Sequence, residues 1–381
     1  MSAVLELTQA LINRASVTPD DGGCQALIAE RLSALGFTHH ALARGEVSNQ
    51  LSLSPNDGPL LLFLGHTDVV PPGPEAAWQS PPFHATERGG YLYGRGAADM
   101  KSSLAAFVCA CEQLDAIEHL GIRIGLLLTS DEEGPAEDGI RAVTQALSEL
   151  AGPIDWCLVG EPSSHAQLGD VIRIGRRGSL SAAVRFYGQQ GHVAYPAGAD
   201  NPVPRLAAFL AALSATHWDE GNAAFPPTSL QITQLATDTH ASNVVPGEAS
   251  AQFNLRFAPT SSADSLRVRV EQLIEEHAGD RPSAVDWHLS AEPFMSEPGA
   301  LRAAVDEVIE AHTGTRPVAN TAGGTSDGRF IAPLGAEVIE FGPVNASIHQ
   351  VDERINLDEL DALSDCYKNI ILTLARMTQA R

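Results

Sequence analysis

A histidine and an aspartate stand two residues apart, directly after an apolar run. His66 and Asp68 follow residues 60–64, which have the length and composition of a strand buried on both faces. Ligands bind at the carboxyl ends of strands in open α/β sheets. An imidazole there can ligate a metal ion, and a carboxylate can fix its tautomer through the other ring nitrogen. Taken by itself the pair is better explained as a polar loop cap, so other residues must decide.

The same arrangement recurs after three further apolar runs. The side chains that follow them are Glu132 and Glu133 after residues 122–128, Glu161 after residues 156–160, and His349 a short loop after residues 338–341. Charged groups gathered at one edge of a sheet repel each other unless a cation lies among them. The four runs together therefore indicate a metal site.

Two acidic segments add candidates to this edge. Asp99 precedes a predicted helix over residues 102–114. An N-cap is the more common use of such an aspartate, but beside His66 it could bridge two metal ions. Glu132 and Glu133 are either a solvated acidic turn or a pair in which one side chain is a ligand and the other carries a proton. The glycines of residues 94–96 are not followed by the Gly-Lys-Ser/Thr of a phosphate loop, which excludes that function.

The elements that position these residues belong to an α/β fold. A chain of 381 residues is too long for one ordinary core, so two domains are expected. The pattern of residues 178–291 predicts the element order β-α-β-β-α-β, with strands that are apolar on one face only. This order is typical of a ferredoxin-like fold with an antiparallel sheet. We predict that they form an inserted domain. Residues 1–177 and 292–381 then make a catalytic domain whose central, mostly parallel sheet is flanked by helices.

Composition limits the partners. Lys and Arg number 24 against 47 Asp and Glu, a net charge of −23, which repels nucleic acid. No run is long enough to cross a membrane, and residues 1–10 lack the basic region of a signal peptide. The five cysteines are an odd, scattered set that we interpret as reduced core thiols. We therefore expect a cytoplasmic protein with no nucleic-acid or membrane partner.

Several motifs carry a resemblance to a known family. Four segments resemble motifs of the dinuclear zinc amidohydrolase family of aminoacylases and carboxypeptidases. They are residues 65–71, 94–101, 130–134 and 160–164. Five further segments extend the resemblance over nearly the whole chain and narrow it to one member of the family. They are residues 176–179, 190–196, 225–229, 323–330 and 342–346. The chain departs from the family pattern at Ser102, where glycine is usual, and at residues 47–50.

The resemblance implies two Zn²⁺ per subunit, with Co²⁺ able to substitute. His66 and Glu161 would bind one ion, His349 and Glu133 the other, and Asp99 both. Imidazole and carboxylate ligands suit zinc. Asp68 would support His66, and Glu132 would be the general acid and base of an amide hydrolysis. The family also holds the peptide bond after the bridging aspartate in cis, which here is Asp99–Met100.

The resemblance also implies a homodimer joined through the inserted domain, which would act as a lid. His192 would stabilise the oxyanion in the other subunit's active site, although an exposed loop histidine is the ordinary interpretation. A small anionic amide substrate needs local positive charge. The implied substrate contacts are Arg176, Arg256, Tyr195, Asn243, Gly324, Thr325 and Asn345. The pattern alone equally allows Arg256 to be a solvated strand residue.

There are three alternative functions. The nearest is a sibling deacylase such as an acetylornithine deacetylase. A non-catalytic binding protein on the same scaffold would lack a ligand or the base, and none is missing. A serine hydrolase is excluded because no Gly-x-Ser-x-Gly elbow follows a strand.

Overall fold

The computed structural model describes residues 2–380, which form two compact units. The first unit comprises the chain up to Gly175, Met295–Asn320 and the chain from Ser326 onward; the second comprises Arg176–Phe294 and Thr321–Thr325. These divisions lie within three residues of the predicted boundaries at 177/178 and 291/292. The short segment Thr321–Thr325 was not expected in the second unit.

The first unit is built on an eight-stranded sheet. Its strands, in spatial order, are β1 (Thr38–Ala41), β2 (Asn49–Leu53), β6 (Arg123–Thr129), β3 (Leu60–His66), β7 (Trp156–Val159), β18 (Glu337–Glu340), β8 (Val171–Arg173) and β17 (Val318–Asn320). The central four, from β6 to β18, are parallel. Every residue of β3 and β7 is buried, as expected for strands covered on both faces.

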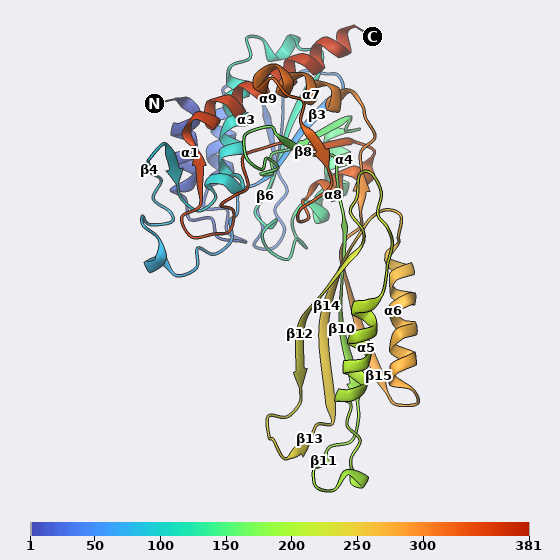
Figure 1. Ribbon diagram of the computed structural model, residues 1–381. Helices are drawn as coiled ribbons and strands as arrows, with labels where there is room; N and C mark the ends of the chain where they lie inside the picture. Colours follow the sequence, from blue (N-terminus) through green and yellow to red (C-terminus); the bar gives the residue numbers. More distant parts are fainter. Residues whose placement is uncertain (1, 381) are drawn as a thin grey trace. The chain divides into compact units, whose positions relative to one another are not determined.

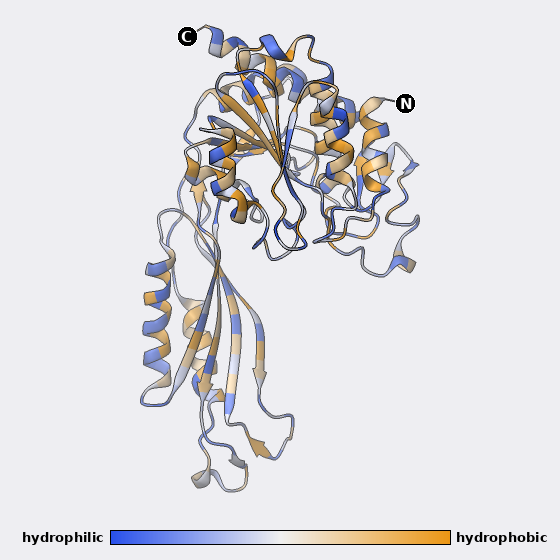
Figure 2. Ribbon diagram, turned by 180° about the vertical axis from the view of Figure 1, so that it is seen from behind, coloured by the Kyte–Doolittle hydropathy of each residue, from blue (hydrophilic) through white to orange (hydrophobic). Residues whose placement is uncertain are grey.

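Helices cover this sheet. They are α1 (Ala3–Ile12), α2 (Cys24–Ser33), α3 (Ser102–Glu112), α4 (Ile140–Ala151), α7 (Ala300–Thr313), α8 (Gly328–Ile331) and α9 (Leu357–Gln379) (Figure 1). The apolar side chains of α1, α3, α7 and α9 join those of the strands in one core. Within it Phe63 stacks on Phe107 at 4.1 Å, and Tyr367 meets Phe63 edge-on at 5.2 Å. Each such pair adds about 0.5–1.5 kcal/mol beyond its burial. Hydrophobic residues run along these strands in Figure 2.

Strand register brings the carboxyl ends of the central strands together. His66 at the end of β3 is level with Thr129 at the end of β6, and Leu64 is level with Val159 at the end of β7. Val159 in turn is level with Glu340 at the end of β18. The four apolar runs singled out in the sequence therefore deliver their polar ends to one edge, which was the basis of the predicted site.

A small sheet joins two segments that are distant in the sequence. It contains β19 (Arg354–Asn356), β5 (Tyr91–Tyr93) and β4 (Thr86–Arg88) in that order. Residues 97–101 follow it as a kinked helical turn, with the Asp99–Met100 peptide bond in cis as the resemblance implied.

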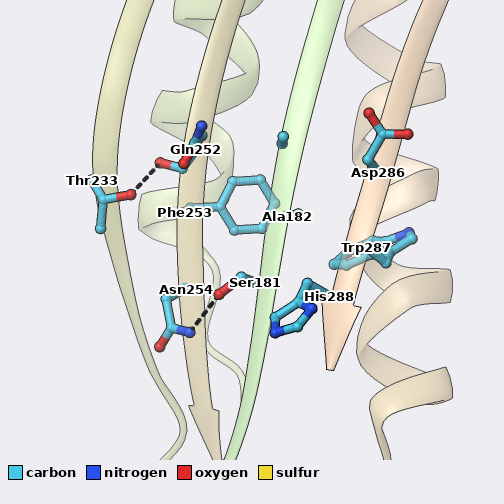
Figure 3. Close-up of a pocket in the computed structure, with 10 residues that line it drawn as sticks. Ser181, Ala182, Thr233, Gln252, Phe253, Asn254, Asp286, Trp287 and His288 are labelled. Carbon is cyan, nitrogen blue, oxygen red and sulfur yellow. Dashed lines mark hydrogen bonds between the residues drawn. The ribbon is translucent and has the colours of Figure 1, made fainter. Parts of the chain in front are cut away.

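The second unit has the predicted ferredoxin-like order. It runs β10 (Gly178–Tyr187), α5 (Val203–Ala215), β12 (Ser229–Thr237), β14 (Glu248–Phe257), α6 (Ala263–Ala278) and β15 (Ser283–Ala291), with sheet order β12-β14-β10-β15. All neighbouring strands are antiparallel. Leu180, Val184 and Phe186 alternate along β10 and pack against both helices in a separate core. Outward-facing side chains line a pocket on the sheet, where Asn254 bonds to Ser181 (Figure 3).

The cysteines and the helices bear on two further expectations. All five cysteines are free and buried. Among the described residues, no helix combines the length and apolar character needed to span a bilayer.

Candidate metal centre and active site

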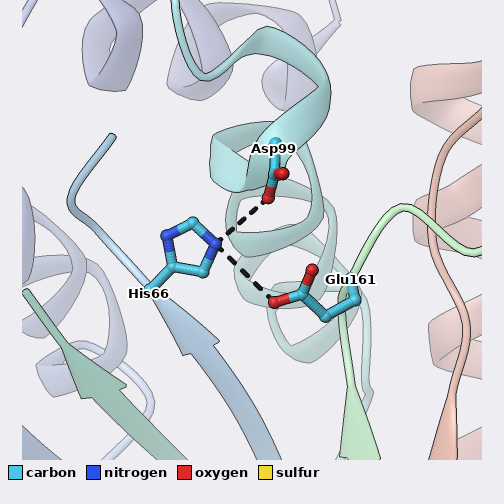
Figure 4. A group of neighbouring side chains, drawn as sticks. All are labelled: His66, Asp99 and Glu161. Atoms are coloured by element: carbon cyan, nitrogen blue, oxygen red, sulfur yellow. Dashed lines mark hydrogen bonds and ion pairs between the residues drawn. The ribbon is translucent and has the colours of Figure 1, made fainter. Parts of the chain in front are cut away.

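The first group of candidate ligands consists of His66, Asp99 and Glu161 (Figure 4). His66 ends β3, Asp99 lies in the turn before α3, and Glu161 follows β7 after one glycine. The His66 Nε2 atom lies 3.1 Å from Asp99 Oδ1 and 3.7 Å from Glu161 Oε1. All three side chains are buried. The ends of β3 and β7 and the turn before α3 therefore bring an imidazole nitrogen and two carboxylates to one point.

The second group consists of Asp99, Glu133 and His349. His349 Nε2 lies 3.0 Å from Glu133 Oε1 and 3.4 Å from Asp99 Oδ2. Asp99 thus directs one oxygen to each imidazole. This places it between the two groups, where the sequence predicted a shared ligand.

The charges of the two groups depend on each other. Burial alone would lower the pKa of His66, but its hydrogen bond to Asp99 and the charges of Asp99 and Glu161 outweigh this and raise it. Hydrogen bonds to Asp99 and Glu133 raise the pKa of His349 to about 10. Burial raises the pKa of Glu161, and the charge of Asp99 adds to this effect. The carboxylates therefore stabilise the protonated form of each imidazole, and the same carboxylates would stabilise a bound cation.

The donor set fits a pair of metal ions. In each group the donor atoms, one imidazole nitrogen and two carboxylate oxygens, all lie within 4.8 Å of one another. This mixture suits zinc, and a carboxylate that faces both groups suits a two-metal site. The predicted ligands His66, Asp99, Glu133, Glu161 and His349 are thus brought together in two overlapping groups. Their role as metal ligands stays a prediction.

The turn that carries Glu132 and Glu133 is held by Asp68. The Asp68 carboxylate accepts the backbone N–H groups of Glu132 at 3.4 Å and of Glu133 at 3.1 Å. The bond to His66 is made by a different atom than expected: His66 Nδ1 donates to the backbone carbonyl of Asp68 at 2.8 Å, while the nearest carboxylate oxygen is 3.7 Å away. The carboxylate instead accepts hydrogen bonds from the two amides of the turn.

Glu132 has the environment of a proton carrier. Burial raises its pKa well above the usual range, and the charges of Asp327, Glu133 and Asp99 add to this effect against that of His66. A raised pKa matches a carboxyl group that must take up and release a proton near neutral pH. Asp327 was given no role from the sequence, yet burial raises its own pKa to about 6.

The candidate substrate contacts belong mostly to the second unit. His192 ends the short strand β11 (Gly191–His192), and Asn243 directly precedes its partner strand β13 (Val244–Val245). The Val193 N–H donates to the Asn243 carbonyl. The Tyr195 ring lies 5.6 Å from that of His192 and is 72% exposed. This loop is open to solvent.

The remaining contacts occupy different surroundings. Arg176 is 6% exposed and donates to the carbonyl of Ala322 at 3.0 Å, which holds the segment that carries Gly324 and Thr325. Arg256 Nε donates to Asn254 on the same strand. Asn345 lies in the first unit, on the loop between β18 and His349.

The sequence matches the model of peptidase family M20/M25/M40 over residues 62–373. The chain belongs to this family and is therefore a metal-dependent hydrolase. It is 53% identical over 375 residues to the succinyl-diaminopimelate desuccinylase of Alkalilimnicola ehrlichii, covering 98% of this chain and 100% of that one. It is 53% identical over 373 residues to the protein of the same name from Stenotrophomonas maltophilia, covering 97% and 99%.

Solved structures share the fold at low sequence identity. An M20 family metallo-carboxypeptidase from Sulfolobus solfataricus has a TM-score of 0.81 at 16% identity, covering 99% of this chain and 100% of that one. A dinuclear metal-binding peptidase of the M20 family from Bacillus subtilis has a TM-score of 0.76 at 13% identity, with 98% of both chains covered. The predicted α/β fold class is confirmed.

Proposed function

We propose that the protein hydrolyses the succinyl amide of N-succinyl-LL-2,6-diaminopimelate to succinate and LL-2,6-diaminopimelate, in lysine and cell-wall precursor biosynthesis. The observation that supports this most strongly is 53% identity to succinyl-diaminopimelate desuccinylases along nearly the whole chain. The second part of the proposal is that the two ligand groups hold two Zn²⁺ ions per subunit, with Co²⁺ able to substitute. A cytoplasmic location completes it, in keeping with five free, buried cysteines.

Each candidate residue has a distinct role in the reaction. His66 and Glu161 would hold one metal ion, Glu133 and His349 would hold the other, and Asp99 would serve both. Ions bound there would lower the pKa of a water molecule and polarise the amide carbonyl. Glu132 takes the proton from the attacking water and delivers it to the leaving amine. Its raised pKa supports this role because a carboxyl group of ordinary acidity would be a poor proton donor at neutral pH.

Positive charge must offset a substrate with several carboxylates, since the chain already carries −23. We assign this to Arg176 and Arg256, with Tyr195, Asn243, Gly324, Thr325 and Asn345 as neutral contacts. His192 would donate to the oxygen on which negative charge develops.

A homodimer joined through the second unit is also proposed. β12 is an edge strand of the four-stranded sheet, and seven of its nine residues, from Gln231 to Thr237, are exposed. It contains no charged residue or proline, and Leu235 is 69% exposed. Such an edge is ready to pair with another strand. The open loop of His192 would then reach the partner subunit.

Glu132→Ala tests the activity. We expect the variant to retain its metal, because Glu132 belongs to neither ligand group, and to lose about 10²–10⁴-fold in kcat. Hydrolysis of the succinyl amide and metal content are measured on the same samples. Glu137→Ala, which removes an exposed carboxylate from the loop after that turn, should behave as wild type. A Glu132→Ala enzyme that stays active would exclude Glu132 as the base.

Turnover of two substrates tests the choice within the family. Wild-type enzyme should cleave N-succinyl-LL-2,6-diaminopimelate with a higher kcat/KM than N-acetylornithine. The opposite order would show that the protein is a deacetylase.

A further inference from the structure

The carboxylate of Glu353 is buried and contacts the turn that carries Asp99. The side chain is 0% exposed. Its Oε1 atom accepts the backbone N–H groups of Ala98 at 2.9 Å and Asp99 at 3.0 Å. Its Oε2 atom accepts the N–H of Gly96 at 3.0 Å. One carboxylate therefore fixes three amides of the turn, including that of the candidate bridging ligand.

Arg95 extends this contact to the turn that carries His349. Its Nη1 atom donates to Glu353 Oε2 at 2.8 Å and to the carbonyl of Gln350 at 3.2 Å. The Gly94 N–H donates to the Glu353 carbonyl at 3.0 Å, which continues the pairing of β5 with β19. The segments of Asp99 and of His349 are thus joined through one buried ion pair.

The turn after His349 needs external support. His349 has φ 60° and Asp352 has φ 58°, in the left-handed region that side chains other than glycine rarely adopt. Such conformations persist where the surroundings enforce them. Between these two residues, the Gln350 carbonyl accepts from Arg95, and Glu353 follows directly.

We propose that Glu353 is a positioning residue of the metal centre. It fixes the position of the bridging Asp99 relative to His349, so that both ion sites form together. The inference rests on the two-metal centre of the proposed function. It goes beyond it by assigning metal affinity to a side chain that belongs to neither ligand group. Groups that orient metal ligands typically change metal affinity 10–100-fold when they are replaced.

The chain offers a matched control in Glu337. Its carboxylate also accepts three backbone N–H groups, from Gly299 at 3.0 Å, Leu301 at 2.9 Å and Arg302 at 2.8 Å. These bonds fix the start of α7, which carries no candidate ligand. Replacing Glu337 therefore measures the loss of a backbone-binding carboxylate without an effect on the metal centre.

Glu353→Gln and Glu337→Gln are compared by Zn²⁺ titration in competition with a chelator, and by thermal unfolding with and without Zn²⁺. In Glu353→Gln the amide NH₂ faces N–H donors, so we expect about 10–100-fold weaker Zn²⁺ binding. The rise in Tm on adding Zn²⁺ should shrink accordingly. Glu337→Gln should lower Tm equally with and without Zn²⁺ and keep wild-type affinity.

Wild-type Zn²⁺ affinity in Glu353→Gln, or an equal loss in Glu337→Gln, would overturn the positioning role. If Glu353→Gln does not fold, Glu353→Asp keeps the charge that faces Arg95 and should show a weaker loss in the same direction; unchanged affinity would again overturn the role. Failure of the proposed activity is separable. A wild-type protein that binds Zn²⁺ but does not cleave the succinyl amide would refute the desuccinylase while the Glu353 comparison still stands.

Discussion

At the scale of single residues, Asp99 organises the site. Its two oxygens face two imidazoles, and the hydrogen bonds from His349 and His66 outweigh burial and lower its pKa. In the sequence, its position before a predicted helix favoured an N-cap, and the bridging role depended on its nearness to His66 and on the family resemblance. Sequence patterns could not show which atom of Asp68 meets His66, nor that Glu353 is buried. In the sequence Glu353 stands in the charged run Asp352–Arg354, which looks like a surface turn; only the structure reveals its contact with Arg95.

These proton affinities make a prediction for the metal-free protein. His349 has a pKa raised from 6.5 to about 10, so its stabilising contribution is complete below pH 6.5 and is lost as pH rises through 10. The raised pKa values of His66, Glu132 and Glu161 act in the same direction, since each group binds its proton more tightly when folded. The lowered pKa of Asp99 acts oppositely, at acid pH.

We therefore expect Tm in a chelator to fall between pH 6.5 and 10, and Zn²⁺ to diminish that fall because the ion replaces the protons. Thermal unfolding across this range, with and without Zn²⁺, is the measurement. A Tm of the metal-free protein that rises with pH would contradict the assigned proton affinities.

At the scale of elements, the parallel strands position the candidate site residues. Apolar runs of strand length predicted β3, β6, β7 and β18 to within two residues at each end, because strands buried on both faces leave a strong pattern. Close contacts between loops leave no such pattern. Gly342 follows β18 at a point where its backbone lies against that of Gly160 and Glu161, and no sequence pattern indicates this contact.

Gly342→Ala should disturb the site through that contact. A Cβ atom at Gly342 would lie 2.5 Å from the Glu161 carbonyl oxygen and 2.6 Å from that of Gly160. Because backbone must move to relieve this, we expect a loss of about 1–3 kcal/mol in the free energy of unfolding and weaker metal binding. Denaturant unfolding and Zn²⁺ titration measure the two effects. Gly198→Ala, where a Cβ meets nothing within 4 Å, is the control; equal stability of the two variants would contradict the contact.

At the scale of the whole molecule, two units with different sheets were predictable. Continuous apolar runs mark the first unit and alternating ones the second, so residues 178–291 could be set apart from the sequence. The assignment of Thr321–Thr325 to the second unit was not predictable, because it depends on contacts such as that of Arg176 with Ala322 rather than on a repeating pattern.

The proposed dimer predicts complementation between two inactive variants. If His192 acts in the partner's active site, co-expressed Glu132→Ala and His192→Ala subunits should form mixed dimers that regain activity. One site of each mixed dimer then combines an intact Glu132 with an intact His192 from the other subunit. Activity no higher than that of the separate variants would place His192 in its own subunit's site or outside catalysis.

The most direct test of the central claim is the number of metal ions per chain, measured by elemental analysis after dialysis into Zn²⁺ and removal of excess metal. We predict two ions for the wild type. We predict loss of tight binding at both positions for Asp99→Ala, because one carboxylate serves both groups. A wild-type chain that retains less than one ion, or an Asp99→Ala chain that still retains two, would contradict a shared two-metal centre.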